Sequence, residues 1–230
     1  MSGARSIAGM RTCLVLRLPL AGLALGALAG AALPGSELVV RDLDINAVAL
    51  PTSFTYALTG SGSSGAGNDA FASGTGLGVG GRWSLARPGD ALGLVLGLDA
   101  MLEDWTYGSS ADALFAADLR ASAGLGWAIT PHWTAIAELG AGYGFSHLDL
   151  PASAIAPAFS ASGDHFAYDV RADLRWQFAR GLVFVVQGGW LHSEHSFSNG
   201  SISDLKLTQS GLYAGIGFTW RFSDAPERLE

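Results

Sequence analysis

The stretch DVRADLRWQF, residues 169–178, alternates charged and apolar residues with a period of two. The charged positions are Asp169, Arg171, Asp173 and Arg175, and the apolar ones are Val170, Ala172, Leu174 and Trp176. Because successive side chains of a strand point to opposite faces, the stretch predicts a β-strand with one apolar and one charged face. In a soluble sheet the charges would face water. In a membrane barrel the apolar face would meet lipid and the charges would pack inside.

The same alternation recurs between turn-forming residues along the chain and predicts eight strands. They lie at about 53–61, 71–85, 91–104, 113–128, 133–147, 165–179, 182–196 and 208–222. An even number of antiparallel strands suits a closed outer-membrane barrel, whose strands cross with only about 9–11 residues each. The predicted fold class is therefore all-β, an eight-stranded antiparallel up-and-down transmembrane β-barrel over residues 53–222.

The connections between these strands alternate in length. Residues 86–91, 130–133 and 179–181 form tight turns, whereas 60–69, 105–112, 149–164 and 197–207 form longer polar or small-residue stretches. Short turns are typical of the periplasmic side of such a barrel and long loops of the extracellular side. An aromatic belt is expected at each end. The belt at the long-loop end is predicted to contain Phe71, Trp105, Phe115, Tyr143, Phe145, Phe166, Tyr168 and Trp190.

Residues 1–31 have the pattern of a cleavable signal peptide. Three arginines precede the apolar run LPLAGLALGALAGAA, which leads into an A-x-A-like site at Ala29 and Ala31. Cleavage is expected after Ala31 or Ala32, and Met10 is an alternative start of translation. An uncleaved anchor is the other interpretation. Residues 32–52 are predicted to be either a periplasmic segment or an extension of the first strand, and 223–230 a short C-terminal tail.

The charge balance bears on the partners. Removal of residues 1–31 takes away three of the 13 basic residues and none of the 20 acidic ones, which leaves 10 − 20 = −10. This balance argues against nucleic acid and against a polybasic membrane-surface domain. The only cysteine, Cys13, lies in the removed segment, so no disulfide framework and no thiol nucleophile are expected.

The inward positions of the predicted strands collect charged residues. They are Arg82, Asp99, Glu103, Asp118, Arg120, Glu138, Asp169, Arg171, Asp173, Arg175 and Arg221. Side chains just fill the interior of an eight-stranded barrel, and buried charges require partners. The pattern therefore predicts an ion-pair network in a plugged polar lumen. A narrow or gated ion path is the alternative.

The chain resembles the small eight-stranded outer-membrane barrels of the OmpA/OmpX type, over essentially the whole of the predicted mature chain. The most specific element is the final strand GLYAGIGFTWRF, whose aromatic end is similar to the signal read by the barrel-assembly machinery. The resemblance implies that Phe218, Trp220 and Phe222 carry this signal. Here the tail SDAPERLE follows Phe222, whereas many members of the family end at the aromatic residue.

Four histidines lie near the long-loop ends: His147, His165, His192 and His195. His165 and His195 have inward parity and the other two have outward parity, so neither a metal site nor any other cofactor is predicted. The stretch HSEHSFSNG (192–200) also resembles the His-x-Ser-Asn motif of PagL-type lipid A deacylases. That resemblance implies His195 with Ser193 or Ser198 as catalytic residues, although Ser198 follows His195 with one residue too many for a shared face.

Taken together, these features predict a non-enzymatic envelope or surface-exposed protein in the outer membrane of a Gram-negative-type cell. The expected partners are outer-membrane lipid and lipopolysaccharide, the barrel-assembly machinery and an extracellular ligand at the long loops. Two alternatives remain open: a PagL-like deacylase and a small low-conductance channel.

Overall fold

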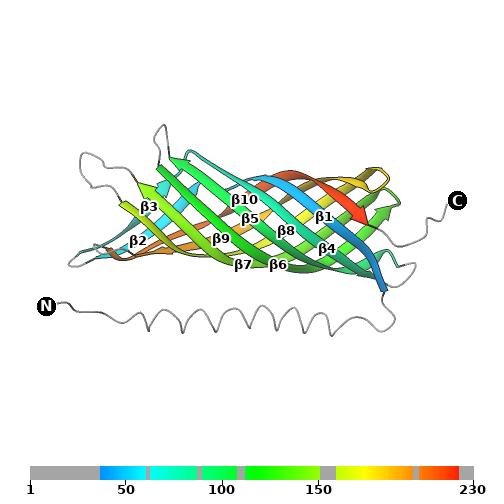
Figure 1. The fold of residues 1–230 in the computed structure, drawn as a ribbon, viewed down its shortest axis with the longest axis horizontal. Coiled ribbons are helices and arrows are strands. Elements are labelled where there is room, and N and C mark those ends of the chain that lie inside the picture. The colour runs from blue at the N-terminus through cyan, green and yellow to red at the C-terminus, as the bar shows by residue number, and fades with distance from the viewer. Residues whose placement is uncertain are drawn as a thin grey trace.

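The computed structural model describes residues 37–60, 63–86, 90–107, 112–150, 159–198 and 202–222, and this part of the chain is built of β-strands (Figure 1). The strands are β1 (Glu37–Ala49), β2 (Ser53–Gly60), β3 (Ser63–Ala70), β4 (Ser73–Ala86), β5 (Leu92–Tyr107), β6 (Asp112–Thr130), β7 (Trp133–Leu150), β8 (Phe159–Ala179), β9 (Leu182–Phe197) and β10 (Ile202–Phe222). Within these residues, no helix is both long and apolar enough to cross a membrane. The predicted signal peptide and C-terminal tail lie outside the described residues.

Eight of these strands close into an antiparallel ring in the order β1-β4-β5-β6-β7-β8-β9-β10, with β10 paired back to β1. The register can be followed from each residue to its partner on the next strand, once around the ring. The residues met in this order are Ile45, Val79, Ala100, Leu119, Tyr143, Phe166, Glu194, Thr208 and Thr55. One circuit thus advances ten residues, from Ile45 to Thr55. This stagger implies strands inclined by roughly 40–45° to the barrel axis, close to the usual tilt of closed barrels. The predicted eight-stranded antiparallel barrel is confirmed.

The ring begins at Glu37 rather than at residue 53, and residues 37–49 form part of its first strand, as in the predicted alternative in which residues 32–52 extend that strand. β1 and β2 form one long strand interrupted at Leu50–Thr52, because both halves pair with β10 in the same register: Ala49 lies opposite Ala214 and Phe54 opposite Gln209. Pro51 has no amide hydrogen to donate to a ladder, which accounts for the interruption. The residue pattern changes across Pro51 because the side chains that fill the lumen change there from polar to apolar. The inward positions turn from Asp42 and Asn46 to Leu50 and Phe54 without a change of parity.

The hairpin of β2 and β3 extends the wall beyond the ring at the end of the barrel away from the C-terminus (Figure 1). β3 occupies most of the stretch 60–69 that was predicted to be a long loop. Two other strands also begin earlier than predicted, β8 at Phe159 and β10 at Ile202. Each of these has 21 residues, or about 70 Å of strand. The wall therefore continues well past the thickness of a bilayer on the long-loop side.

The two faces of the wall differ sharply in chemistry. Large apolar side chains are exposed on the outside of every ring strand, among them Leu43, Leu77, Leu102, Leu119, Leu139, Val170, Val186 and Leu212. Two residues assigned to the outer aromatic belt are instead buried inside, Phe71 and Trp105. Trp105 has the parity of Glu103 and points into the lumen, where its indole N–H donates to the carbonyl oxygen of Pro51 at 3.0 Å. A buried indole needs such an acceptor.

Inward glycines make room for the charged side chains. A Cβ on Gly80 would lie 2.0 Å from Oδ1 of Asp99 and 2.7 Å from the carbonyl oxygen of Leu98. A Cβ on Gly97 would lie 2.3 Å from Oγ of Ser122. Because an eight-stranded barrel is narrow, these positions leave the space that the ion pairs occupy.

We expect Gly80→Ala to lower the free energy of unfolding by about 1–3 kcal/mol, the usual effect of overpacking, because the new methyl group would displace Asp99. Gly188→Ala is the matched control. Its Cβ would meet only the carbonyl oxygen of Tyr213, at 3.4 Å. Urea unfolding of the refolded barrel in detergent or vesicles would measure both. Equal stability of the two variants would contradict the packing role of Gly80.

Candidate functional site: the layered lumen

The lower lumen, on the short-turn side, is organised around Arg82 of β4. Its guanidinium group contacts carboxylates on three other strands: Asp44 through Nη1, Asp99 through Nη2 at 3.1 Å, and Glu138 through Nε at 3.2 Å. Arg82 is 2 % exposed, so these ion pairs are shielded from bulk water. Charge-assisted hydrogen bonds of this kind are strong, and here they join β1, β4, β5 and β7 through the interior.

Two arginines of β8 extend this network. Arg171 contacts Glu138 at 2.5 Å and Asp99 at 3.5 Å. Arg175 contacts Asp42 and Asp44 of β1 at 3.0 Å each. Within β8, Arg175 also contacts Asp173 at 3.1 Å, since residues two apart share a face. Arg221 of β10 completes the layer with a second contact to Asp42, at 3.1 Å.

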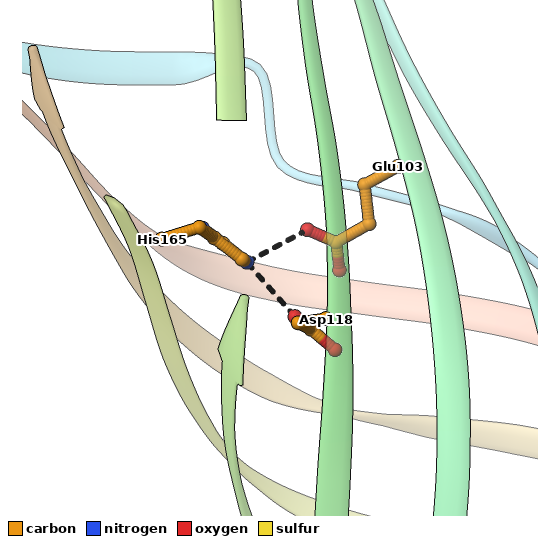
Figure 2. A group of neighbouring side chains, drawn as sticks. All are labelled: Glu103, Asp118 and His165. Atoms are coloured by element: carbon orange, nitrogen blue, oxygen red, sulfur yellow. Dashed lines mark hydrogen bonds and ion pairs between the residues drawn. The ribbon is translucent and has the colours of Figure 1, made fainter. Parts of the chain in front are cut away.

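A second charged cluster lies above this layer and consists of Glu103 on β5, Asp118 and Arg120 on β6, and His165 on β8. Figure 2 shows three of these side chains, Glu103, Asp118 and His165. Nε2 of His165 lies 2.8 Å from Oδ2 of Asp118 and 3.5 Å from Oε2 of Glu103. Nη2 of Arg120 contacts both carboxylates, that of Asp118 at 2.8 Å. Nearby, the hydroxyl of Tyr213 donates to Asp169 at 3.0 Å.

An apolar layer closes the long-loop end of the lumen. Trp105 packs edge-on against Phe54 and against His195, each at 5.6 Å between ring centroids. Phe54 in turn packs on Phe71 at 4.9 Å. Leu114, Leu148, Leu191 and Phe197 are buried in the same cluster. His195 stacks on His165 at 4.5 Å, so the apolar layer rests directly on the second charged cluster.

A small internal cavity of about 20 Å³ lies between the charged and apolar layers. It is lined by Asn46, Arg120, Asp169, Arg171 and Gln187 among others. A volume of this size accommodates about one water molecule. Within the described residues, the lumen is therefore filled by ion pairs below and by aromatic and aliphatic side chains above.

The structure places every predicted member of the charge network inside the barrel: Arg82, Asp99, Glu103, Asp118, Arg120, Glu138, Asp169, Arg171, Asp173, Arg175 and Arg221. It adds two acids that the sequence interpretation missed, Asp42 and Asp44. The signal was present, since Asp42, Asp44 and Asn46 alternate with Leu43 and Ile45 as charges do in 169–175. These acids were missed because residues 32–52 were predicted to be either a periplasmic segment or an extension of the first strand, and no inward face was assigned to them.

The residues of the predicted deacylase motif do not form one open site. Ser193 and His195 are both fully buried, with Oγ and Nε2 3.4 Å apart, beneath the apolar layer. Ser193 donates instead to Gln209 at 3.0 Å. Ser198 is exposed and lies beyond the end of β9. The predicted assembly-signal residues Phe218, Trp220 and Phe222 are outward and exposed at the end of β10.

Two Ser–His–acid groups occur on the outer face instead. In the first, His192 lies 2.6 Å from Oγ of Ser210 through Nδ1 and 3.5 Å from Glu194 through Nε2. In the second, His147 lies 2.9 Å from Oγ of Ser162 and 3.1 Å from Asp149. Each serine stands directly opposite its histidine on the neighbouring strand, and each acid is two residues along from it. Sequence spacing alone could not reveal the cross-strand partner.

An apolar outer wall around a charged, ion-paired interior is the reverse of a water-soluble protein. With every ring strand paired on both sides, such a wall satisfies its backbone groups internally, as a lipid environment demands. Fold and lumen together define a small β-barrel of the membrane-spanning class.

Comparison with known proteins finds solved structures that have low sequence identity to this chain and low structural similarity scores. The attachment invasion locus protein of Yersinia pestis is 15% identical with a TM-score of 0.41, and the match covers 81% of this chain and 100% of that one. The outer-membrane protein OprG from Pseudomonas aeruginosa is 12% identical with a TM-score of 0.47, covering 82% and 98%. The outer-membrane protease OmpT from Escherichia coli is 6% identical, also at 0.47, covering 81% and 98%. No family model and no curated protein matches the chain.

The lower ion-pair layer leads to a direct prediction. Replacing Arg175 with Leu should lower the free energy of unfolding by about 3–5 kcal/mol, because Asp42, Asp44 and Asp173 would lose a buried partner. Lys206→Leu is the control, because its pair with Glu194 lies partly exposed on the outer face and should contribute less than about 1 kcal/mol. Urea unfolding checks both, and an Arg175→Leu barrel as stable as the Lys206→Leu barrel would refute the role of the network.

Proposed function

We propose that this protein is an exported, non-enzymatic barrel of the outer membrane that is closed to solutes and presents its extended long-loop rim to the cell exterior. The observation that carries the proposal is the filled lumen inside a lipid-facing wall. The charged layer and the apolar layer lie one above the other, and each fills the narrow interior with side chains from many strands. A wall that projects beyond the bilayer is suited to contact with other molecules at the surface.

The remaining expectations belong to this proposal. Residues 1–31 would direct export, Phe218, Trp220 and Phe222 would be read by the barrel-assembly machinery, and outer-membrane lipid with lipopolysaccharide would surround the apolar wall. The arrangement of aromatic side chains on that wall supports a lipid boundary. Tyr168 and Trp190, for example, pack at 5.7 Å on the outer face near the long-loop end.

A closed lumen predicts that the refolded protein produces no discrete conductance steps in planar bilayers, because an ion would have to break several buried ion pairs. The same preparation should migrate differently on a gel before and after boiling, which verifies that the inserted protein is folded. Regular single-channel steps from the heat-modifiable form would refute the closed barrel in favour of the channel alternative.

The outward Ser210–His192–Glu194 group supports a second candidate, an acyl-ester hydrolase that acts on a lipid of the outer leaflet. His192 would take the proton of Ser210 as its Oγ attacks an ester carbonyl, and would then deliver that proton to the departing alcohol. Water would release the acyl group as a free acid. His192 lies among Tyr168 and Trp190, at 4.7 Å and 6.0 Å between ring centroids, and therefore at the expected headgroup level.

Mass spectrometry of lipid A from a host that expresses the protein separates the two candidates. The closed, non-enzymatic barrel predicts an unchanged acylation pattern. The hydrolase predicts loss of an acyl chain with the wild type and with Ser162→Ala, but not with Ser210→Ala. Ser162 is the matched control because it belongs to the other outward Ser–His–acid group, with His147 and Asp149.

A further inference from the structure

In the second charged cluster, Glu103, Asp118 and His165 hold three potential metal-ligand atoms within 4.8 Å of one another. Figure 2 shows these three side chains. They come from three different strands and converge on one point of the lumen. The sequence interpretation found no metal site, because it compared histidines only with one another. The strand register supplies the carboxylate partners that this comparison lacked.

Among the residues that the structure describes, Oε2 of Glu103 has no hydrogen-bond partner, although Glu103 is 1 % exposed. It points toward Nε2 of His165, at 3.5 Å. A buried carboxylate oxygen left in this way is costly, because it has lost water without gaining a donor. This atom is thus a ready acceptor for a cation placed between the three residues.

The other oxygens of the cluster are fixed by Arg120. Its guanidinium group contacts Oε1 of Glu103, and its Nε lies 3.1 Å from Oδ1 of Asp118. Hydrogen bonds of this type from outside a metal site orient the ligating carboxylates. Arg120 also contacts Oδ2 of Asp118, at 2.8 Å through Nη2 and 3.1 Å through Nε. Of the two oxygens that face His165, Oε2 of Glu103 is therefore the one without a hydrogen bond among the described residues.

The charge of the whole interior also calls for a cation. Among the described residues, the inward side chains include eight carboxylates, those of Asp42, Asp44, Asp99, Glu103, Asp118, Glu138, Asp169 and Asp173. Five guanidinium groups face them, those of Arg82, Arg120, Arg171, Arg175 and Arg221. With neutral histidines and all eight carboxylates ionised, the excess is 8 − 5 = 3 negative charges. One divalent cation would reduce it to one.

We infer that Glu103, Asp118 and His165 bind one divalent transition-metal ion of the zinc type in the lumen, beneath the apolar layer. One imidazole nitrogen with two carboxylate oxygens is a donor set suited to such ions. Ligands about 2.0–2.1 Å from a tetrahedral ion lie about 3.3 Å apart. The present separations from Nε2, 2.8 Å and 3.5 Å, lie on either side of that spacing, and all three ligand atoms lie within 4.8 Å of one another.

The bound ion would join β5, β6 and β8 directly. It would also fix the imidazole of His165, on which His195 and thus the apolar layer rest. Occupancy is therefore expected to stabilise the closed end of the lumen. Since the ligands are fully or almost fully buried, loading is expected during refolding rather than by soaking of the finished barrel.

The test is metal retention by the tag-free, full-length protein. The wild type, Glu103→Gln, His165→Asn and the control His147→Asn would be refolded in detergent with zinc, dialysed extensively and analysed for zinc per folded barrel. His147 is the matched control because it also has a carboxylate partner, Asp149, but lies on the outer face. Heat-dependent gel mobility would establish the folded fraction of each sample.

The expected result is about one zinc ion per barrel in the wild type and in His147→Asn, with at least a tenfold loss in Glu103→Gln and His165→Asn. Refolding of the wild type with cobalt gives a second measurement that needs no variant. A tetrahedral site should produce strong visible absorption that zinc suppresses. A wild type that retains no zinc and shows no such absorption would overturn the inference. Equal retention in all four proteins would also overturn it, because it would assign the zinc to the surface.

Discussion

The pairing of buried carboxylates with guanidinium groups is the constraint on which the rest of this barrel depends. An unpaired charge in so narrow an interior would cost several kcal/mol, so the contacts of Arg82, Arg171 and Arg175 limit how the strands can be arranged. A register slip of one residue would turn every inward charge toward lipid. The inward glycines follow from the same requirement, because a Cβ at Gly80 would occupy the space of Asp99.

The side chains that fill the lumen differ between the two halves of the barrel along its axis. Ion pairs fill the short-turn half, and the cluster around Trp105 and Phe54 fills the long-loop half, where the wall extends beyond the bilayer. Close to this extension, the outer face bears the histidines that contact Ser210 and Ser162. The interior thus provides rigidity and closure, and chemistry accessible from outside is confined to the outer wall and rim.

Much of the fold follows from residue parity alone. Alternation predicted the ring of eight strands, and it also predicted the inward direction of Arg171 and Arg175, because a period of two is a local property of the chain. Three features depended on contacts between distant residues and were not predictable in this way. The choice between a periplasmic segment and an extended first strand before Pro51 required the pairing with β10. The indole of Trp105 found its acceptor across the lumen, and Glu103 met His165 only through the register of four strands. Parity gives the face of each residue but not its height along the barrel.

The contacts between the first and last ring strands have a consequence for assembly. Asp42 and Asp44 of β1 provide charge for Arg175 of β8 and Arg221 of β10, and Thr219 of β10 donates to Asp44. Until β1 joins β10, Arg175 of β8 and Arg221 of β10 lack these counterions, and Asp42 and Asp44 lack their partners on β8 and β10. Closure of the seam is therefore an electrostatic event as well as a backbone one. A sheet with its seam open would carry exposed charges at both edges, which would disfavour half-closed intermediates and make the last step of folding cooperative.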